Sequence, residues 1–528
     1  MSVRIKPMYW SQNKQKRVLV SIFIFLGMFL FLAQWGAKYA VKDFLARKTP
    51  PHLELNYTDL SVSAFSGTID FDGLSLEVKN RDSLQVHTFL KSESLELEGL
   101  SYLQLLFNNT ISLDAVVLQQ PKLKYYPYNY FPTKKAKSKG VVSLLKTISI
   151  EKLDIKDGSF HIMKDAPDSL QVSITNYDFT FYGGITDPKL ITQKIPLEYD
   201  SYDLSATEIF ADLGKYETLK VANLTTSENE FQLNDVNLSS KYGKEELSKH
   251  LTIERDYVQL QIPEVKLGNL AFGFEKNRFE IAAKSLKFKR PTVEIYRDKL
   301  VADDMRIKPL YGKLLRDMPL TIAVDQLKIE NGLLTYEEKV DEQQEAGKLS
   351  FEELNAELNY ISNREDAKDI NIAATTKLMG QADFKLDWRF NANDNADAFT
   401  VSGVLLNLKA TELNPFLEPN LRTRAKGSVD EMYFTVSGNS FSSQGDMKMK
   451  YHDFKFNVLD KDRLKINKVL TVIGNIFVND GSKTEADGFR YGTMEVQRES
   501  NKSFYNYLWL NIRDGMISTL TGNGKKEN

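Results

Sequence analysis

From Pro50 to about Asp460, apolar and polar residues alternate with a period of two. This alternation is typical of β-strands with one apolar and one polar face, and we therefore predict a mainly β fold. If a strand and its turn take roughly 13–16 residues, the region holds about 25–30 strands. A clear example late in the chain has apolar side chains on one face and Lys385, Asp387 and Arg389 on the other; the apolar residues are Phe384, Leu386, Trp388 and Phe390.

Glycine, asparagine and aspartate separate the alternating runs. The pairs of interest are Asp72-Gly73, Asp157-Gly158, Asn331-Gly332 and Gly438-Asn439. Such pairs are favoured where φ must be positive, as in type I′ turns, so we expect short antiparallel hairpins to be the usual connection. The alternation also shifts by one residue at His452 and Asp453, which predicts a turn or a bulge.

The sequence contains internal similarity. Residues 151–162 align with residues 325–336 at an offset of 174, and QQPKLKYY around Pro121 resembles KRPTVEIY around Pro291 at an offset of 170. These matches predict two copies of a β unit, at about 94–165 and 285–340, as in folds built from repeated elements. Tyr102 to Leu118 also resembles Tyr311 to Leu327 at another offset, which allows a smaller repeated element.

Two segments without apolar alternation interrupt the strands. The segment Phe131 to Val142 is basic, and Glu337 to Lys348 is acidic. We expect each of them to be a protruding, solvated connection.

After Asp460 the apolar period changes to about 3.6, which predicts a helical region over 461–528. One candidate helix has its apolar face at Leu464, Ile466, Val469, Leu470 and Ile473. A second has it at Phe504, Tyr507, Leu508, Ile512, Met516 and Leu520. The second helix would cap the apolar strands, lie on a membrane surface or dock to a partner, and we favour the cap.

The most apolar stretch of the chain runs from Val18 to Trp35. A helix of about 18 residues at ~1.5 Å per residue covers roughly the 30 Å of a bilayer core, and we predict a membrane span over 18–39. A cleaved signal peptide is the alternative, but Gln34, Trp35 and Lys38 occupy the place where small residues should mark the cleavage site.

Charge sets the predicted orientation of this span. Five lysines and arginines precede it and no acidic residue appears before Asp43, so residues 1–17 should stay in the cytoplasm. The β-rich region 40–460 and everything after it then lie on the other side.

Composition excludes several functional classes. The formal charge is −2, and removing the five positive charges of residues 1–17 leaves −7, without a basic stripe for nucleic acid. The absence of cysteine excludes disulfides, cysteine-ligated metals and thiol catalysis, and suits a bacterial envelope protein. The histidines are dispersed without metal-binding spacing, and we expect strand or turn roles for them; they are His52, His87, His161, His250 and His452. No G-x-S-x-G motif is present, so the sequence predicts no enzyme, metal or cofactor.

The apolar strand faces need a cover. Little helix is predicted between Pro50 and Asp460, so the cover would be a second sheet, an ordinary core, or no protein at all if one sheet curls around a trough. In the last case the candidate groove-lining residues are Val258, Leu260, Ile262, Leu286, Phe288, Leu354, Leu358, Phe384, Leu386, Trp388, Phe390, Met447, Met449, Phe454 and Phe456.

The arrangement resembles the AsmA-like family of bacterial envelope proteins. The resemblance rests on the basic start and span at 1–39, on Ser61 to Val78, Ser94 to Tyr126 and Val436 to Leu459, and on the closing segment 503–520. It implies a single-pass inner-membrane anchor that carries a periplasmic, elongated antiparallel sheet curled into a groove, related to the chorein-type bridge-like lipid transfer proteins. The chain is shorter than the large members of that family.

The resemblance also implies partners and a function. Inner-membrane lipids, a phospholipid cargo and other envelope proteins are the expected partners, and phospholipid transfer towards the outer membrane is the expected activity. An apolar trough lowers the free energy of an acyl chain by ~0.8 kcal/mol per buried methylene. The alternatives are a non-catalytic assembly factor for the outer membrane and, third, an anchored enzyme.

Overall fold

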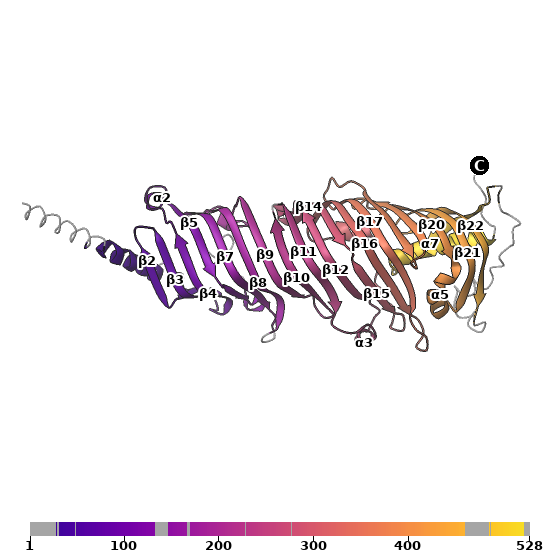
Figure 1. The fold of residues 1–528 in the computed structure, drawn as a ribbon, viewed down its shortest axis with the longest axis horizontal. Coiled ribbons are helices and arrows are strands. Elements are labelled where there is room, and N and C mark those ends of the chain that lie inside the picture. The colour runs from indigo at the N-terminus through magenta and orange to yellow at the C-terminus, as the bar shows by residue number, and fades with distance from the viewer. Residues whose placement is uncertain are drawn as a thin grey trace, which may run out of the picture. The chain divides into compact units, whose positions relative to one another are not determined.

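The structure is a computed structural model that describes residues 28, 31–47, 49–131, 146–165, 169–227, 229–275, 277–459, 485 and 487–521. It is mainly β, with 58% of residues in strands, and this confirms the predicted fold class (Figure 1). The chain divides into two compact units, residues 1–207 and 208–528, with the boundary inside strand β9 (Ser201–Asp212).

Unit 1 contains eight described strands besides the first half of β9. Strands β3, β4, β7 and β8 form its long ladders, with β1 and β2 on β3, and β5 and β6 between β4 and β7. The strands are β1 (Leu53–Asn56), β2 (Asp59–Ser63), β3 (Thr68–Lys79), β4 (Val86–Glu98), β5 (Thr110–Gln119), β6 (Lys122–Tyr125), β7 (Thr147–Met163) and β8 (Leu170–Thr186).

Unit 2 continues the β architecture with fourteen described strands after β9. Most strands pair with the next along the chain, but β14 and β15 both lie between β12 and β16, and the short β13 pairs with β14. The strands are β10 (Glu217–Ser227), β11 (Glu230–Ser240), β12 (Tyr257–Gly268), β13 (Ala271–Glu275), β14 (Arg278–Lys289), β15 (Thr292–Asp298), β16 (Thr321–Lys339), β17 (Gly347–Ser362), β18 (Ile370–Leu378), β19 (Ala382–Phe390), β20 (Phe399–Lys409), β21 (Thr423–Gly438), β22 (Ser442–Val458) and β23 (Arg490–Gln497).

Helices are few in the described part of the chain. Residues 31–47 form a helix, here called the N-terminal helix. The others are α2 (Tyr102–Phe107), α3 (Lys244–Lys249), α4 (Tyr311–Arg316), α5 (Asn414–Leu421) and α7 (Phe504–Thr521), with short 3₁₀ turns at Pro127–Asn129, Leu190–Thr192 and Ala410–Leu413. Helix α7 confirms the helix predicted near the end of the chain. Strand β23 falls inside the region predicted to be helical, so that prediction was wrong there.

The prediction of a purely antiparallel sheet was also wrong. Strands β5 and β6 run parallel to β7, and β14 and β15 run parallel to β16. A parallel pair needs a long crossover, and the segments 126–146 and 299–320 provide it. The basic segment that begins at Phe131 belongs to the first crossover, and its residues 132–142 lie outside the described residues.

The two parallel arrangements have the same geometry. In each, one strand is interrupted before a proline, where Gln120 and Arg290 have positive φ of 48° and 49°. The backbone N–H groups of Gln120 and Arg290 donate to the parallel neighbour at 2.8 and 2.7 Å, and Pro121 and Pro291 accept through their carbonyl groups. Since proline has no N–H to donate, the interruption keeps the ladder satisfied on both sides. The sequence repeat at these prolines thus corresponds to a repeated structural unit.

Three of the four predicted Asx-Gly hairpins are not hairpins. Asp72-Gly73, Asp157-Gly158 and Asn331-Gly332 lie inside β3, β7 and β16. Asp157 and Asn331 have positive φ of 52° and 51°, and the register shifts beside them. The left-handed residue therefore makes a bulge within a long strand, because a bulge needs the same backbone conformation as a tight turn. Gly438-Asn439 does lie at the β21–β22 hairpin, where Asn439 N donates to Ser442 O at 3.0 Å.

Of two further predictions about connections, one is confirmed and one holds only in part. The phase shift at His452 and Asp453 is a bulge within β22, where Asp453 has a φ of 47°. It lies against Gly427, whose missing Cβ leaves room for the Asp453 carbonyl. The acidic segment Glu337 to Lys348 is only in part the solvated connection that was predicted, because it forms the ends of β16 and β17 as well as the turn between them, and Asp341 in that turn pairs with Arg422 at 2.9 Å.

Most of the predicted membrane span lies outside the described residues, as does the candidate helix at 464–473. Within the described part, no helix combines the length and the apolar character needed to cross a bilayer. The N-terminal helix packs Ala37, Val41 and Leu45 against a small core in the first strands of unit 1. The buried residues of that core are Leu60, Val62, Phe71 and Leu74.

Candidate functional site

The candidate site is the apolar face of unit 2, which is built from rows of side chains that run across the strands. Directly paired residues share a face of the sheet, so the strand register shows which side chains form a row. One row crosses eleven strands, from β11 to β23, without a polar residue. Its members are Phe231, Leu267, Leu286, Leu327, Leu358, Ile372, Trp388, Val401, Val436, Gly445 and Met494.

A second row runs beside it from β10 to β23 and is equally apolar. It contains Leu224, Leu233, Val265, Phe288, Ile329, Ala356, Ala374, Leu386, Gly403, Phe434, Met447 and Gly492. A shorter row contains Leu219, Leu238, Leu260, Val293, Leu334, Phe351, Leu378 and Ala382. These rows form one apolar face, and the sequence periodicity predicted the part of it that β12, β14, β17, β19 and β22 contribute.

The exposure of the predicted groove residues changes along this face. On β12 to β17 most are half-buried, namely Val258, Leu260, Leu286, Phe288, Leu354 and Leu358, while Ile262 is buried. On β22, Met447, Met449 and Phe454 are at most 2% exposed and belong to a closed core, so they line no open groove. Phe384, Leu386, Trp388, Phe390 and Phe456 are partly buried and pack against that core. The face thus has a more open part on β12–β17, where α5 packs on β16 and β17 through contacts such as Phe416 with Tyr336, and a covered part on β19–β23.

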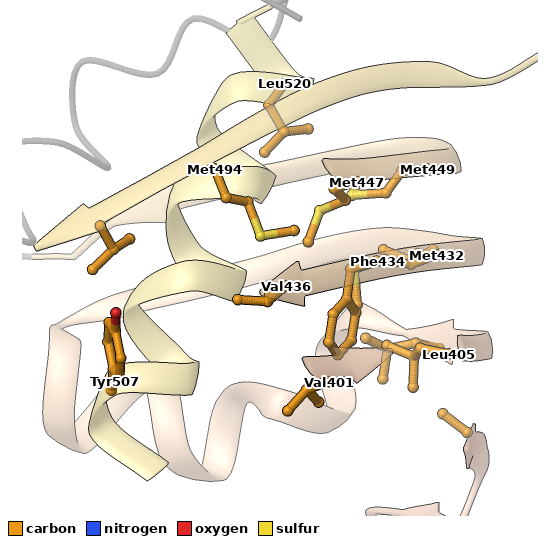
Figure 2. Close-up of a cluster of buried hydrophobic side chains, with 14 of the residues drawn as sticks. Val401, Leu405, Met432, Phe434, Val436, Met447, Met449, Met494, Tyr507 and Leu520 are labelled. Carbon is orange, nitrogen blue, oxygen red and sulfur yellow. The ribbon is translucent and has the colours of Figure 1, made fainter. Parts of the chain in front are cut away.

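Helix α7 makes the cover. Its side chains pack on β22 and β23, and Figure 2 shows Tyr507 and Leu520 of the helix on either side of Met494 and Val436. Gly515 brings the helix close to Met494, since an added Cβ there would lie 2.9 Å from the Met494 methyl carbon. This close approach seals the methionine-rich end of the apolar face.

Aromatic and polar contacts fix the start and the middle of α7. At its start, the ring of Phe504 stacks on Trp388 at 4.4 Å, with Tyr311 of α4 edge-on to Trp388. Further along, Asn511 is fully buried, accepts from Ser443 Oγ at 2.8 Å and donates to Tyr507 O at 2.9 Å. The buried hydrogen bond between Ser443 and Asn511 fixes the position of the helix, because a shift of α7 would leave both of these polar side chains buried without a partner.

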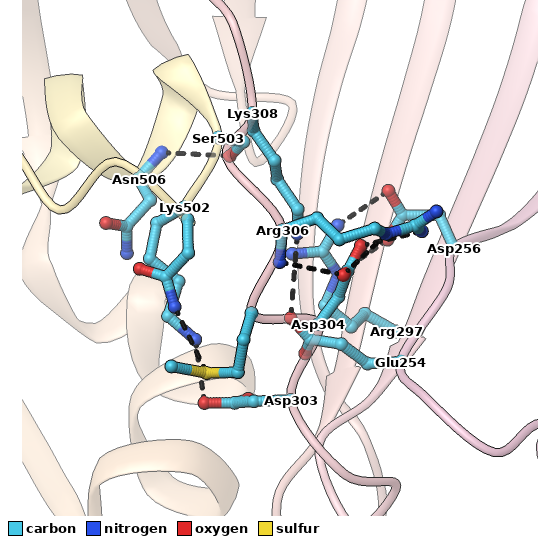
Figure 3. Close-up of polar contacts among 12 residues, drawn as sticks. Glu254, Asp256, Arg297, Asp303, Asp304, Arg306, Lys308, Lys502, Ser503 and Asn506 are labelled. Atoms are coloured by element: carbon cyan, nitrogen blue, oxygen red, sulfur yellow. Dashed lines mark hydrogen bonds and ion pairs between the residues drawn. The ribbon is translucent and has the colours of Figure 1, made fainter.

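A polar cluster ties the approach to α7 to the β15–β16 crossover (Figure 3). Lys502 Nζ lies 2.9 Å from a carboxylate oxygen of Asp303, and Lys308 N donates to Ser500 O at 2.9 Å. The Lys502 ammonium lowers the pKa of Asp303. Behind it, Arg297 donates two hydrogen bonds to Asp256, at 2.6 and 2.7 Å. The crossover therefore positions the covering helix.

Glu254 is the most deeply buried acid of this cluster, with a side chain 1% exposed. Lys299 Nζ lies 2.6 Å from one carboxylate oxygen and Lys308 Nζ 3.7 Å from the other. Burial opposes ionisation, but the ammonium of Lys299 outweighs it and the pKa of Glu254 falls below its ordinary value of 4.5.

This pKa predicts a pH dependence of stability. Because the folded pKa lies below the unfolded one, the pair stabilises unit 2 fully above about pH 4.5, and this contribution is lost as the pH falls through the folded pKa. We expect Glu254→Gln to flatten the decline of the unfolding midpoint below pH 4.5, measured by thermal unfolding at several pH values. The exposed Glu245→Gln is the control, and an unchanged acid profile in Glu254→Gln would contradict the prediction.

Unit 1 has the same kind of face. One row contains Leu60, Phe71, Leu95, Leu118, Ile155 and Phe179, and the next contains Val62, Ile69, Leu97, Val116, Leu153 and Phe181. The N-terminal helix covers the β2 and β3 end of these rows.

The histidines do not come together with other ligands. His87 and His161 lie in strands, and His452 pairs with Asp430 at 2.5 Å on the surface. Within the residues that the structure describes, no group of three or more histidine, aspartate or glutamate side chains is placed to hold a metal ion.

Neither a known family model nor a curated protein matches this chain.

Proposed function

We propose that this protein handles lipid, holding acyl chains of phospholipid against the open part of its apolar face. The observation that carries the proposal is the continuity of the two long apolar rows, which run from β10 and β11 to β23, while in the described part of the chain α7 packs on β19–β23 and α5 on β16 and β17. The half-buried side chains on β12–β17 still expose apolar surface to water. Burying that surface lowers the free energy by ~25 cal/mol per Å², and an acyl chain would supply this burial.

The sheet curled into a groove, the periplasmic location and the inner-membrane anchor belong to this proposal. They rest on the sequence, through the apolar segment Val18 to Trp35 and the resemblance to AsmA-like proteins. In this arrangement phospholipid would move along the apolar face between the inner and outer membranes. No side chain needs to be catalytic, since the lipid is not changed chemically.

Lipid extraction tests this function. We expect the full chain, purified in a mild detergent from its native membrane, to retain phospholipid that mass spectrometry detects after extraction. A membrane protein with one anchor helix and a closed soluble domain provides the background level. Phospholipid no higher than this background would contradict the proposal and would favour the alternative, a non-catalytic assembly factor for the outer membrane.

A further inference from the structure

Helix α2 of unit 1 exposes three large apolar side chains. Leu103, Leu106 and Phe107 are 71%, 74% and 78% exposed, and the helix buries none of its residues. Because a six-residue helix is too short to persist on its own, other parts of the unit must hold it in place. Its exposed apolar side chains therefore do not stabilise the helix within the unit, and a different role must be sought for them.

The contacts that hold α2 are polar and leave the apolar side chains free. Tyr102 Oη donates to Ala64 O at 2.8 Å, and Lys146 Nζ donates to Leu105 O at 3.2 Å. Asn108 Nδ2 donates to Gln104 Oε1 at 2.7 Å, so the polar side chains of this segment pair with each other.

Ala64 lies in the turn between β2 and β3, and this turn also holds the N-terminal helix. The Gln34 side chain donates to Val62 O and accepts from Ala64 N, the latter at 2.9 Å. Between this helix and β2 lies an open depression of about 360 Å³, lined in part by Phe31, Trp35 and Lys38. Figure 1 shows α2 at the same end of unit 1 as the N-terminal helix.

The turn between β2 and β3 is held by backbone contacts and adds another exposed aromatic ring. Phe65 is 63% exposed. Gly67 has a φ of 68° and packs against the backbone of Leu100, whose N–H donates to Gly67 O at 3.0 Å. The helix and α2 are thus both hydrogen-bonded to Ala64 of this turn, and each of the three elements exposes apolar side chains. We call these exposed side chains the α2 patch; they are Phe31, Trp35, Phe65, Leu103, Leu106 and Phe107.

The chain itself indicates what covers the α2 patch. Phe31 and Trp35 are the last part of the apolar segment that begins at Val18, which the sequence predicts to span a membrane. The membrane surface would therefore cross the N-terminal helix near the 64% exposed Trp35 and the 63% exposed Tyr39, at the level where aromatic rings lie in membrane proteins. The hydrogen bonds of the β2–β3 turn keep α2 beside that level.

We propose that the α2 patch inserts into the lipid headgroup region of the membrane from which the N-terminal segment emerges. The chain would then contact the bilayer at two places, and the first strands of unit 1 would lie against the membrane surface with a fixed orientation. Lys38 and Lys146 beside the patch suit phosphate headgroups. This proposal rests on the membrane anchor of the proposed function, but it does not depend on whether the open apolar face of unit 2 carries lipid.

Depth-dependent quenching tests the proposal. The chain has no cysteine, so Leu106→Cys gives a single attachment site for an environment-sensitive fluorophore. The full chain would be reconstituted into vesicles of phosphatidylcholine and phosphatidylglycerol that contain a lipid with a nitroxide near its headgroup. We expect quenching at position 106 to exceed that at the exposed control Thr175→Cys in β8 by about threefold or more.

A second variant links the quenching to the patch. Adding Leu103→Asp and Phe107→Asp to Leu106→Cys should reduce quenching to the level of the Thr175 control. Equal quenching at 106 and 175 in the unaltered patch would overturn the proposal, and so would failure of the chain to float with vesicles. Energy transfer between labels on different chains, without lipid quenching, would show that a second copy covers the patch instead.

Discussion

Leu286→Asp is expected to lower the phospholipid bound to the purified protein at least about tenfold, because a carboxylate placed beside an acyl chain loses its hydration without gaining a partner. Leu286 is half-buried on the open part of the apolar face, between Leu267 and Leu327 in the first row. Because Leu286 is only half-buried among the described residues, the new carboxylate can turn towards water when lipid is absent. The unfolding midpoint should therefore fall by only a few degrees.

The neighbouring residue provides the matched control. Ser285 is exposed on the opposite, polar face of β14, so Ser285→Asp adds the same charge one residue away. It should leave both bound lipid and stability unchanged. Lipid phosphate per mole of protein and thermal unfolding are the two measurements. If Leu286→Asp retained lipid, or if it unfolded the protein and did not release the lipid, the open part of the face would be an ordinary core.

Val436→Asp is expected to have the opposite pattern, a loss of folding. Val436 is 0% exposed and lies in the same row as Leu286, but under α7 between Val401 and Gly445 (Figure 2). Leaving an unpaired carboxylate there costs several kcal/mol, which is a large part of the roughly 5–15 kcal/mol that stabilises a typical domain. We expect little soluble folded protein, or a low unfolding midpoint by circular dichroism.

Ser437→Asp is the control for this substitution. Ser437 is the next residue of β21 and is exposed on the polar face, so a charge there should change stability by less than about 0.5 kcal/mol. A Val436→Asp protein that folded as well as Ser437→Asp would show that α7 does not seal this end of the face.

The sequence predicted the apolar face well, because period two assigns each side chain to a face without knowledge of the strand order. Leu286 and Trp388 were both assigned to the apolar face for this reason, and the strand register places them in one row. What the period cannot say is which strands lie beside each other. Strand β16 pairs with β14 and β15 in parallel, and this depends on a crossover whose path is set by distant contacts such as Lys308 with Ser500.

Two other features could not be predicted from local pattern. Asp157-Gly158 and Gly438-Asn439 both supply residues suited to positive φ, yet the first makes a bulge and the second a turn, because tertiary pairing decides whether the chain continues or reverses. The sequence analysis favoured a cap of this helix on the apolar strands, which the packing of α7 confirms, but which strands it covers could not be predicted, since its fit depends on Gly515 and on the buried Asn511. The separation of open from covered groove residues follows from that fit.

The interruption at Gln120-Pro121 and Arg290-Pro291 has a consequence for how such a protein could evolve. Each repeat begins and ends with its apolar side chains in phase with the neighbouring strands, so a duplicated repeat joins the existing edge without altering any residue already there. Every added strand would lengthen the apolar face by ~4.8 Å. Gene duplication can therefore change the length of the apolar face by one repeat at a time, while selection on the residues of the existing strands stays the same.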